Sequence, residues 1–353
     1  MMPRFVILCG CFALSGLAAL VYQTAWTRQF ALVFGTSELA VATVLAAYMG
    51  GLALGARLIE PLLPRIRRAV QWYALLELGI GVAALVLVPL GLWLAERLLV
   101  NWFGGQADPP SAGHAGNTLF YLVSAFAILL VPTTLMGATL PLLTRDGVHS
   151  DAQIGPRIGL LYAWNTAGAV AGALLAALWL LPAVGLSATV WSAAGVNLLV
   201  CVLALLLLRG RLAAEPVAVA PAARETQRAQ VAGRWSQFAL PGAGWVLPLL
   251  LLSGAVSFLH EVLWTRLLQR IVGSSIHAFG IMVASFLIGI ALGGAAGSRL
   301  ATSRAHAARW LVASQVGIAL GAALAWYSVL AFAPALTADW QRNGFSLAVL
   351  LPL

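Results

Sequence analysis

The sequence predicts an all-α, polytopic membrane protein that contains two tandem copies of one multi-helix unit, with the second copy truncated. Three observations support this prediction. The 353 residues are 61% hydrophobic and only 9% charged, which leaves too few charged side chains to solvate a globule in water. Apolar runs of transmembrane length recur along the chain, and a long segment near the N-terminus recurs 238 residues later.

The apolar runs define the expected elements, because a bilayer core needs about 20 apolar residues per helix. Nine runs meet this length, at 5–26, 38–57, 70–95, 118–143, 157–181, 186–208, 245–265, 277–297 and 310–335. A tenth begins near Phe345 and is cut off at Leu353. The stretch 209–243, rich in Ala, Pro, Gln and Arg, lacks helical periodicity and reads as a flexible linker. We therefore expect a first repeat at 1–208, a cytoplasmic linker at 209–243 and an incomplete second repeat at 244–353.

The basic residues indicate orientation. All twenty are arginine, and fifteen of them lie in the N-terminus, the even-numbered loops and the linker, against five in the odd-numbered loops. The positive-inside rule then places the N-terminus and the linker in the cytoplasm. Because the arginines sit in short loops and form no single stripe, the net charge of +9 does not indicate nucleic-acid binding.

The internal repeat is visible without a gap. A shift of 238 residues places 15–55 on 253–293, with thirteen of 41 positions identical. The identities include polar and turn residues as well as apolar ones: Trp26/Trp264, Thr27/Thr265, Arg28/Arg266, Gly35/Gly273 and Ser37/Ser275. Six helices precede the linker, an even number, so both copies enter the membrane in the same direction. Parallel repeats of this kind are typical of the major-facilitator architecture.

Two Trp-Thr-Arg motifs close the outward ends of the first and seventh predicted helices. Trp26 with Arg28, and Trp264 with Arg266, favour the headgroup level, where Trp is enriched and Arg can reach out of the hydrocarbon. Membrane anchoring explains these residues. A pair of equivalent arginines at a periplasmic gate is the functional alternative.

Small residues recur at helical spacing on three predicted helices. They permit close approach between helix backbones, so we interpret them as packing positions. The positions are Gly51 and Gly55, Gly168 and Gly172, and Gly289 and Gly293.

Polar residues inside the apolar runs are the candidate functional residues, because an ionisable side chain in hydrocarbon needs a partner or a wet cavity. The 238-residue shift places Gln23 on Glu261 and Glu77 on Gln315. Each half then holds one Glu and one Gln, for which we expect a hydrogen-bonded pair. The alternative is two carboxylates lining a central cavity, with Glu261, next to His260, as the better candidate. Asn165 and Asn197 are further buried polar residues; for Asn165 we expect an inter-helix bond.

The sequence offers no catalytic constellation. Cys9, Cys11 and Cys201 lie in apolar runs without metal-ligand spacing, and they read as small hydrophobic residues. The eleven acids are scattered. We expect no metal and no cofactor in this chain.

Several segments together resemble the membrane portion of the fused major-facilitator/spermidine-synthase-like proteins of bacteria. They include "SGLAALVYQTAWTR", "FGTSELAVATVLAAYMGGLALG", "VPTTLMGATLPLLTR", "RIGLLYAWNTAGAVAGALLAALWLLPAVGL" and "SGAVSFLHEVLWTRLLQRIVGSS". The resemblance implies a major-facilitator-like bundle and, as partner, a soluble aminopropyltransferase-like domain of polyamine chemistry. That domain is absent from this sequence, which has no glycine-rich strand-loop-helix.

Two functions remain open from the sequence. The first is an integral membrane module that tethers or serves such a soluble enzyme. The second is a secondary transporter of a small cation or metabolite, with a cavity near Glu77 and Glu261. The loop after the second helix, "GGLALGARLIEPLLPRIRRAV", has the glycines and arginines of the major-facilitator signature but lacks its aspartate, which favours the architecture more than transport.

Overall fold

The computed structural model describes residues 2–34, 38–102, 115–147, 151–212, 246–272, 276–300 and 304–343. Every regular element in these ranges is helical, so the predicted all-α class is confirmed. The first half contains α1 (Met2–Phe34), α2 (Glu38–Ile59), η1 (Leu63–Arg65), α3 (Ala69–Val82), η2 (Ala83–Leu87), α4 (Val88–Trp102), α5 (Ala115–Gly147), α6 (Asp151–Leu175), η3 (Ala176–Leu180) and α7 (Leu181–Leu212). The second half contains α9 (Val246–Val272), α10 (Ile276–Leu300) and α11 (Arg304–Asn343). Most of the predicted linker and the predicted tenth helix lie outside the described residues.

Seven helical stretches in the described part of the chain are long and apolar enough to cross a membrane. They are Arg4–Val33, Ala42–Ile59, Ala69–Asn101, Leu119–Arg145, Arg157–Leu208, His277–Gly297 and Arg309–Val329. The fifth, 52 residues long, contains two of the predicted runs. The predicted run 245–265, most of which lies in α9, is not among the seven, and part of this run lies outside the described residues. The chain is a multi-pass membrane protein.

Three irregular points interrupt the long helices. η2 joins α3 to α4 and η3 joins α6 to α7, and both are single π-helical segments. A π segment holds more residues per turn than the α-helix on either side of it. Gly185 has φ +78° and ψ 178°, a backbone conformation that disfavours any side chain. The break at Gly185 separates the predicted runs 157–181 and 186–208.

The first half packs as an elongated bundle. α2 lies along α5, α1 lies between α6 and α7, and α3 contacts both α5 and α7. Glycines permit the closest of these approaches. A Cβ on Gly51 or Gly55 of α2 would overlap Thr133 or Thr134 of α5, and one on Gly168 of α6 would overlap Ala13 of α1.

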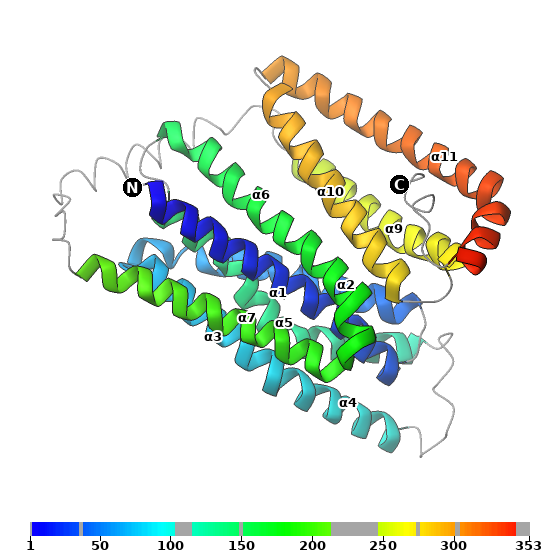
Figure 1. Ribbon diagram of the computed structural model, residues 1–353, viewed down its shortest axis with the longest axis horizontal. Coiled ribbons are helices and arrows are strands. Elements are labelled where there is room, and N and C mark those ends of the chain that lie inside the picture. The colour runs from blue at the N-terminus through cyan, green and yellow to red at the C-terminus, as the bar shows by residue number, and fades with distance from the viewer. Residues whose placement is uncertain are drawn as a thin grey trace.

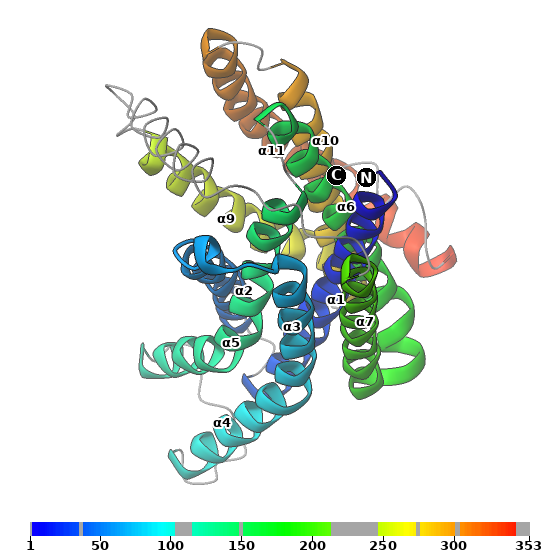
Figure 2. The same ribbon diagram turned by 90° about the vertical axis from the view of Figure 1, so that its left-hand side faces the viewer.

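The second half joins the first through α10. α10 packs against α6 and η3, where Gly280 lies against Ala177. α9 contacts α10 and α11, and α11 lies at the outer edge of the molecule (Figure 1). α9 and α11 run in the same direction as α1 and α3, while α10 runs back like α2 (Figure 1). A view from the side shows α9, α10 and α11 together on one side of the first-half helices (Figure 2).

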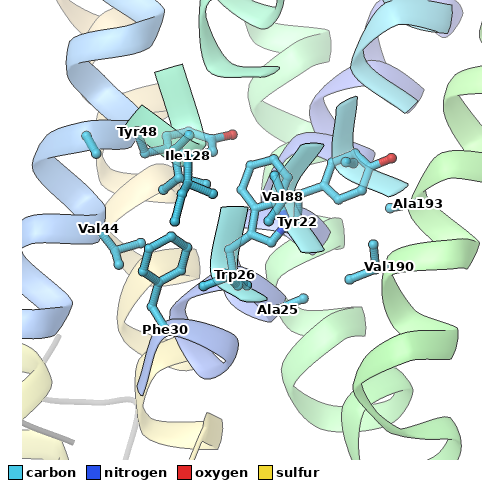
Figure 3. Packing of buried hydrophobic residues seen from close by; sticks show 14 of the residues in the cluster. Tyr22, Ala25, Trp26, Phe30, Val44, Tyr48, Val88, Ile128, Val190 and Ala193 are labelled. Carbon is cyan, nitrogen blue, oxygen red and sulfur yellow. The ribbon is translucent and has the colours of Figure 1, made fainter. Parts of the chain in front are cut away.

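The largest buried cluster lies in the middle of the first half. Figure 3 shows Tyr22, Trp26 and Phe30 of α1 facing Tyr48 of α2 and Ile128 of α5. The rings of Tyr22 and Trp26 stack with centroids 5.0 Å apart. A second cluster, which includes Leu8, Phe12, Leu143 and Val200, lies nearer the N-terminal end of α1. Both clusters include the partly buried Val196 of α7, which is next to Asn197 and its set of polar side chains.

Candidate functional site

The polar set joins three helices through one carboxylate. Glu77 of α3 has no exposed surface. Its Oε1 accepts a hydrogen bond from Ser15 Oγ of α1 at 2.6 Å, and its Oε2 accepts one from Asn197 Nδ2 of α7 at 2.7 Å. Asn197 Oδ1 in turn accepts a bond from the Tyr22 hydroxyl at 2.8 Å. We call Ser15, Glu77, Asn197 and Tyr22 the Glu77 network.

Helix geometry explains why these four side chains meet. Ser15 and Tyr22 are seven residues apart on α1, which is two turns, so both lie on the same face. That face packs against α7, which carries Asn197, and α3 also packs on α7. Both oxygens of Glu77 have a donor, and the amide of Asn197 uses donor and acceptor. In a low-dielectric interior such a network links the helices, because removing any member leaves a buried group unsatisfied.

Gln23 is not the partner of Glu77, contrary to the expected Glu/Gln pair. Gln23 is also buried on α1, but it follows Ser15 by eight residues, or about 12 Å along the helix axis. Glu77 lies level with Ser15 and takes its hydrogen bonds from Ser15 and Asn197. The sequence identified the buried carboxylate and missed Ser15 and Tyr22, because it does not give the relative height of two helices.

A related contact occurs in the second half. Gln315 Nε2 of α11 donates to Ser253 Oγ of α9 at 3.4 Å. The two members of this pair are 62 residues apart in the sequence, as are Ser15 and Glu77. The 238-residue shift places Ser15 on Ser253 and Glu77 on Gln315. Gln315 differs from Glu77 in that it is exposed at the surface of the described helices. The equal spacing of the two Ser pairs is the sequence signal that could have found Ser15.

Glu261 is the second deeply buried acid. Its side chain is 4% exposed on α9, and its carbonyl oxygen accepts a bond from Thr265 Oγ1 at 2.8 Å. Within the described ranges no side chain donates a hydrogen bond to its carboxylate, and Gln315 bonds Ser253 instead. His260, half-buried, stacks on Trp264 at 6.2 Å, and its Nδ1 lies 2.9 Å from the Val256 carbonyl oxygen. A buried carboxylate without a donor can take a proton or a cation.

The two Trp-Thr-Arg motifs differ in their surroundings. Trp26 is fully buried in the first-half core, eight residues before the end of α1 at Phe34. It therefore contacts protein and does not reach the lipid surface. The predicted helix end at 26 is early because the apolar residues 30–34 continue the helix. Arg28 and Arg266 are exposed, and Trp264 is half-buried.

The glycine positions also differ between the halves. Gly51, Gly55, Gly168 and Gly172 all lie against the backbone or side chains of a neighbouring helix. Gly289 and Gly293 of α10 are the positions that match Gly51 and Gly55 after the 238-residue shift. A Cβ on either would meet no atom of the described residues within 4 Å.

The described residues do not assemble a metal centre, since no group of three His, Cys, Asp or Glu side chains lies close enough to hold an ion there. The chemistry of the site is that of buried carboxylates in a helical membrane bundle. No family model, no curated protein and no solved structure matches the chain.

Proposed function

We propose that this chain is the helical membrane module of a major-facilitator-like bundle with two like-oriented repeats, and that it tethers or serves a soluble aminopropyltransferase-like enzyme. The module would lie in a bacterial inner membrane with its N-terminus in the cytoplasm. The sequence resemblance supplies the identity of the partner, and the arrangement of the helices supports the role of the module.

Matched local features support the two repeats. α1 ends at Phe34 and α9 at Val272, while α2 begins at Glu38 and α10 at Ile276; in both cases the positions differ by 238. The hydroxyls of Thr27 and Thr265 each bond the carbonyl four residues earlier at 2.8 Å. The stacked pairs Tyr22–Trp26 and His260–Trp264 also correspond. Chance similarity between apolar helices would not match helix ends and side-chain bonds together.

The Glu77 network is the observation that favours a supporting module over a transporter in the first half. Both carboxylate oxygens bond side chains of other helices, at 2.6 and 2.7 Å. A group that binds and releases a substrate needs free coordination, whereas a group that fixes helices has its bonds satisfied internally. Glu77 therefore acts as a structural link between α1, α3 and α7.

A flotation experiment tests the proposed partner. The full chain is reconstituted into lipid vesicles and mixed with a purified soluble aminopropyltransferase from the same bacterium. We expect the enzyme to float with the vesicles and to stay in solution with vesicles that lack the chain. An enzyme that stays in solution in both cases, at tens of micromolar, contradicts the tethering role.

Glu261 favours a second candidate function, secondary transport of a small cation. It is buried and lacks the donors that Glu77 has, so it retains the capacity to bind a proton or a cation. Uptake of labelled spermidine into proteoliposomes, with and without a pH gradient, tests this function. The transport proposal expects uptake that Glu261→Gln abolishes. Glu96→Gln, which changes an exposed acid on α4, is the control and should leave uptake unchanged.

A further inference from the structure

The loop between α2 and α3 carries a concentration of uncompensated positive charge. Arg65, Arg67 and Arg68 are all exposed. The single acid of the loop, Glu60, is occupied by Arg57, whose Nη1 lies 3.0 Å from Glu60 Oε2. Among the described residues no carboxylate pairs with the other three arginines. Three guanidinium groups within four residues therefore remain available to an external anion.

The loop that carries these charges is held in place by the protein. Ile66, between the arginines, is 7% exposed and packs with Ile59 of α2 and Leu142 of α5. The backbone N–H groups of Arg65 and Ile66 donate to the Leu62 carbonyl at 2.9 and 3.2 Å. The positions of the arginine backbones are thus fixed before any ligand arrives, which reduces the entropy lost on binding.

The surroundings of the arginines match an amphiphile better than a free anion. Leu58, Leu62 and Trp72 are 53%, 46% and 49% exposed around the same loop. In a multi-pass membrane protein, exposed apolar side chains at the ends of spanning helices contact acyl chains, and Trp favours the headgroup level. Cationic and apolar surfaces lie next to each other here, as do the phosphate and the acyl chains of a phospholipid.

We infer that the α2–α3 loop binds the phosphate headgroup of an anionic phospholipid, through Arg65, Arg67 and Arg68, with the acyl chains against Leu58, Leu62 and Trp72. Arginine suits this ligand because its planar fork donates two parallel hydrogen bonds to one phosphate. This proposal is more specific than the positive-inside rule, because it requires saturable lipid binding at defined residues. The proposed lipid site does not depend on which leaflet the loop faces. It is also independent of whether the chain tethers an enzyme or transports a cation.

Native mass spectrometry of the full purified chain tests the site, with cardiolipin and phosphatidylglycerol as probes and phosphatidylcholine as reference. We expect saturable binding of the anionic lipids, weakened about tenfold or more by Arg67→Gln/Arg68→Gln. The matched control is Arg97→Gln/Arg309→Gln, which removes the same charge from exposed arginines on α4 and α11. Equal weakening in both double variants would mean general charge attraction and would overturn the proposal.

Two further measurements separate this site from a free-phosphate site and from misfolding. Inorganic phosphate or glycerol phosphate at millimolar concentration should not displace the lipid, and complete displacement contradicts a lipid site. Glu60→Gln removes the competing acid and frees Arg57, which is 74% exposed with its partner at 68%. Because that pair is on the surface, the fold should tolerate the change and lipid affinity should rise severalfold. An unchanged or lower affinity overturns the role of the loop.

Discussion

At the scale of single residues, the two buried acids of the described helices have different surroundings. Glu77 has a donor for each oxygen, and Glu261 has none among the described residues. The two acids are not at equivalent positions of the repeat, because the 238-residue shift places Glu77 on Gln315 and Gln23 on Glu261. Equivalent positions in the two halves thus alternate between an ionisable side chain and its neutral isostere. The two halves can therefore share one order of helices and still carry their ionisable side chains at different positions.

The Glu77 network predicts energetic coupling between α3 and α7. Glu77→Leu and Asn197→Leu should each lower the free energy of unfolding, because each leaves buried polar groups of the other helices unpaired. The double variant should lose less than the sum, with a coupling energy of roughly 1 kcal/mol. Steric trapping or unfolding in mixed detergent micelles measures these free energies.

Gln23 provides the control for this cycle. Because Gln23 lies about two turns from Ser15 on α1, and Glu77 takes its hydrogen bonds from Ser15 and Asn197, Gln23→Leu and Glu77→Leu should have additive effects. Strong coupling between Gln23 and Glu77, with none between Asn197 and Glu77, would contradict the observed hydrogen bonds and restore the pairing expected from sequence.

At the scale of helices, matched glycines provide an internal comparison. Gly55→Leu should force α2 away from α5, since Gly55 lies directly against the Thr134 carbonyl. Overpacking of this kind lowers the free energy of unfolding by about 1–3 kcal/mol or more. Gly293→Leu changes the corresponding position of α10, where a Cβ would meet no atom of the described residues within 4 Å. Its thermal unfolding midpoint in detergent should stay near that of the unchanged protein, and equal losses at both sites would contradict the packing.

The helices themselves were largely predictable and their contacts were not. Apolar runs locate spanning helices because the bilayer requires about 20 apolar residues per crossing, and eight of the nine expected runs overlap the seven apolar stretches found in the described residues. Glycine spacing indicated the close approaches at Gly51, Gly55, Gly168 and Gly172, but at Gly289 and Gly293 a Cβ would meet no atom of the described residues within 4 Å. The partner of Glu77 depends on the rotation and height of three helices, which composition and spacing do not contain. The burial of Trp26 was missed for a related reason: α1 extends to Phe34.

At the scale of the whole molecule, the like orientation of the two halves can be measured. Leu62, three residues after the end of α2, and Leu300, the last residue of α10, occupy matched positions and are 46% and 40% exposed. Cysteines introduced there, with the three native cysteines replaced by alanine, should react with a membrane-impermeant maleimide from the same side. Asn101→Cys, at the far end of α4, should react only from the other side. Labelling of Leu62→Cys and Leu300→Cys from opposite sides would exclude parallel repeats.

The π segment η2 has a consequence for the whole buried face of α4. Each residue advances an α-helix by about 100°, so the additional residue in η2 turns everything after it by that angle. Val88, Leu92 and Ala95 reach the core from this rotated position, while Leu90 and Trp93 face outward. Removing one residue from 83–87 would turn the rest of the helix by about 100° and move Val88, Leu92 and Ala95 away from the core. In the first two turns of α4 the inward and outward faces thus depend on chain length at a single point and hardly on side-chain polarity, because residues 88–95 are apolar on both faces.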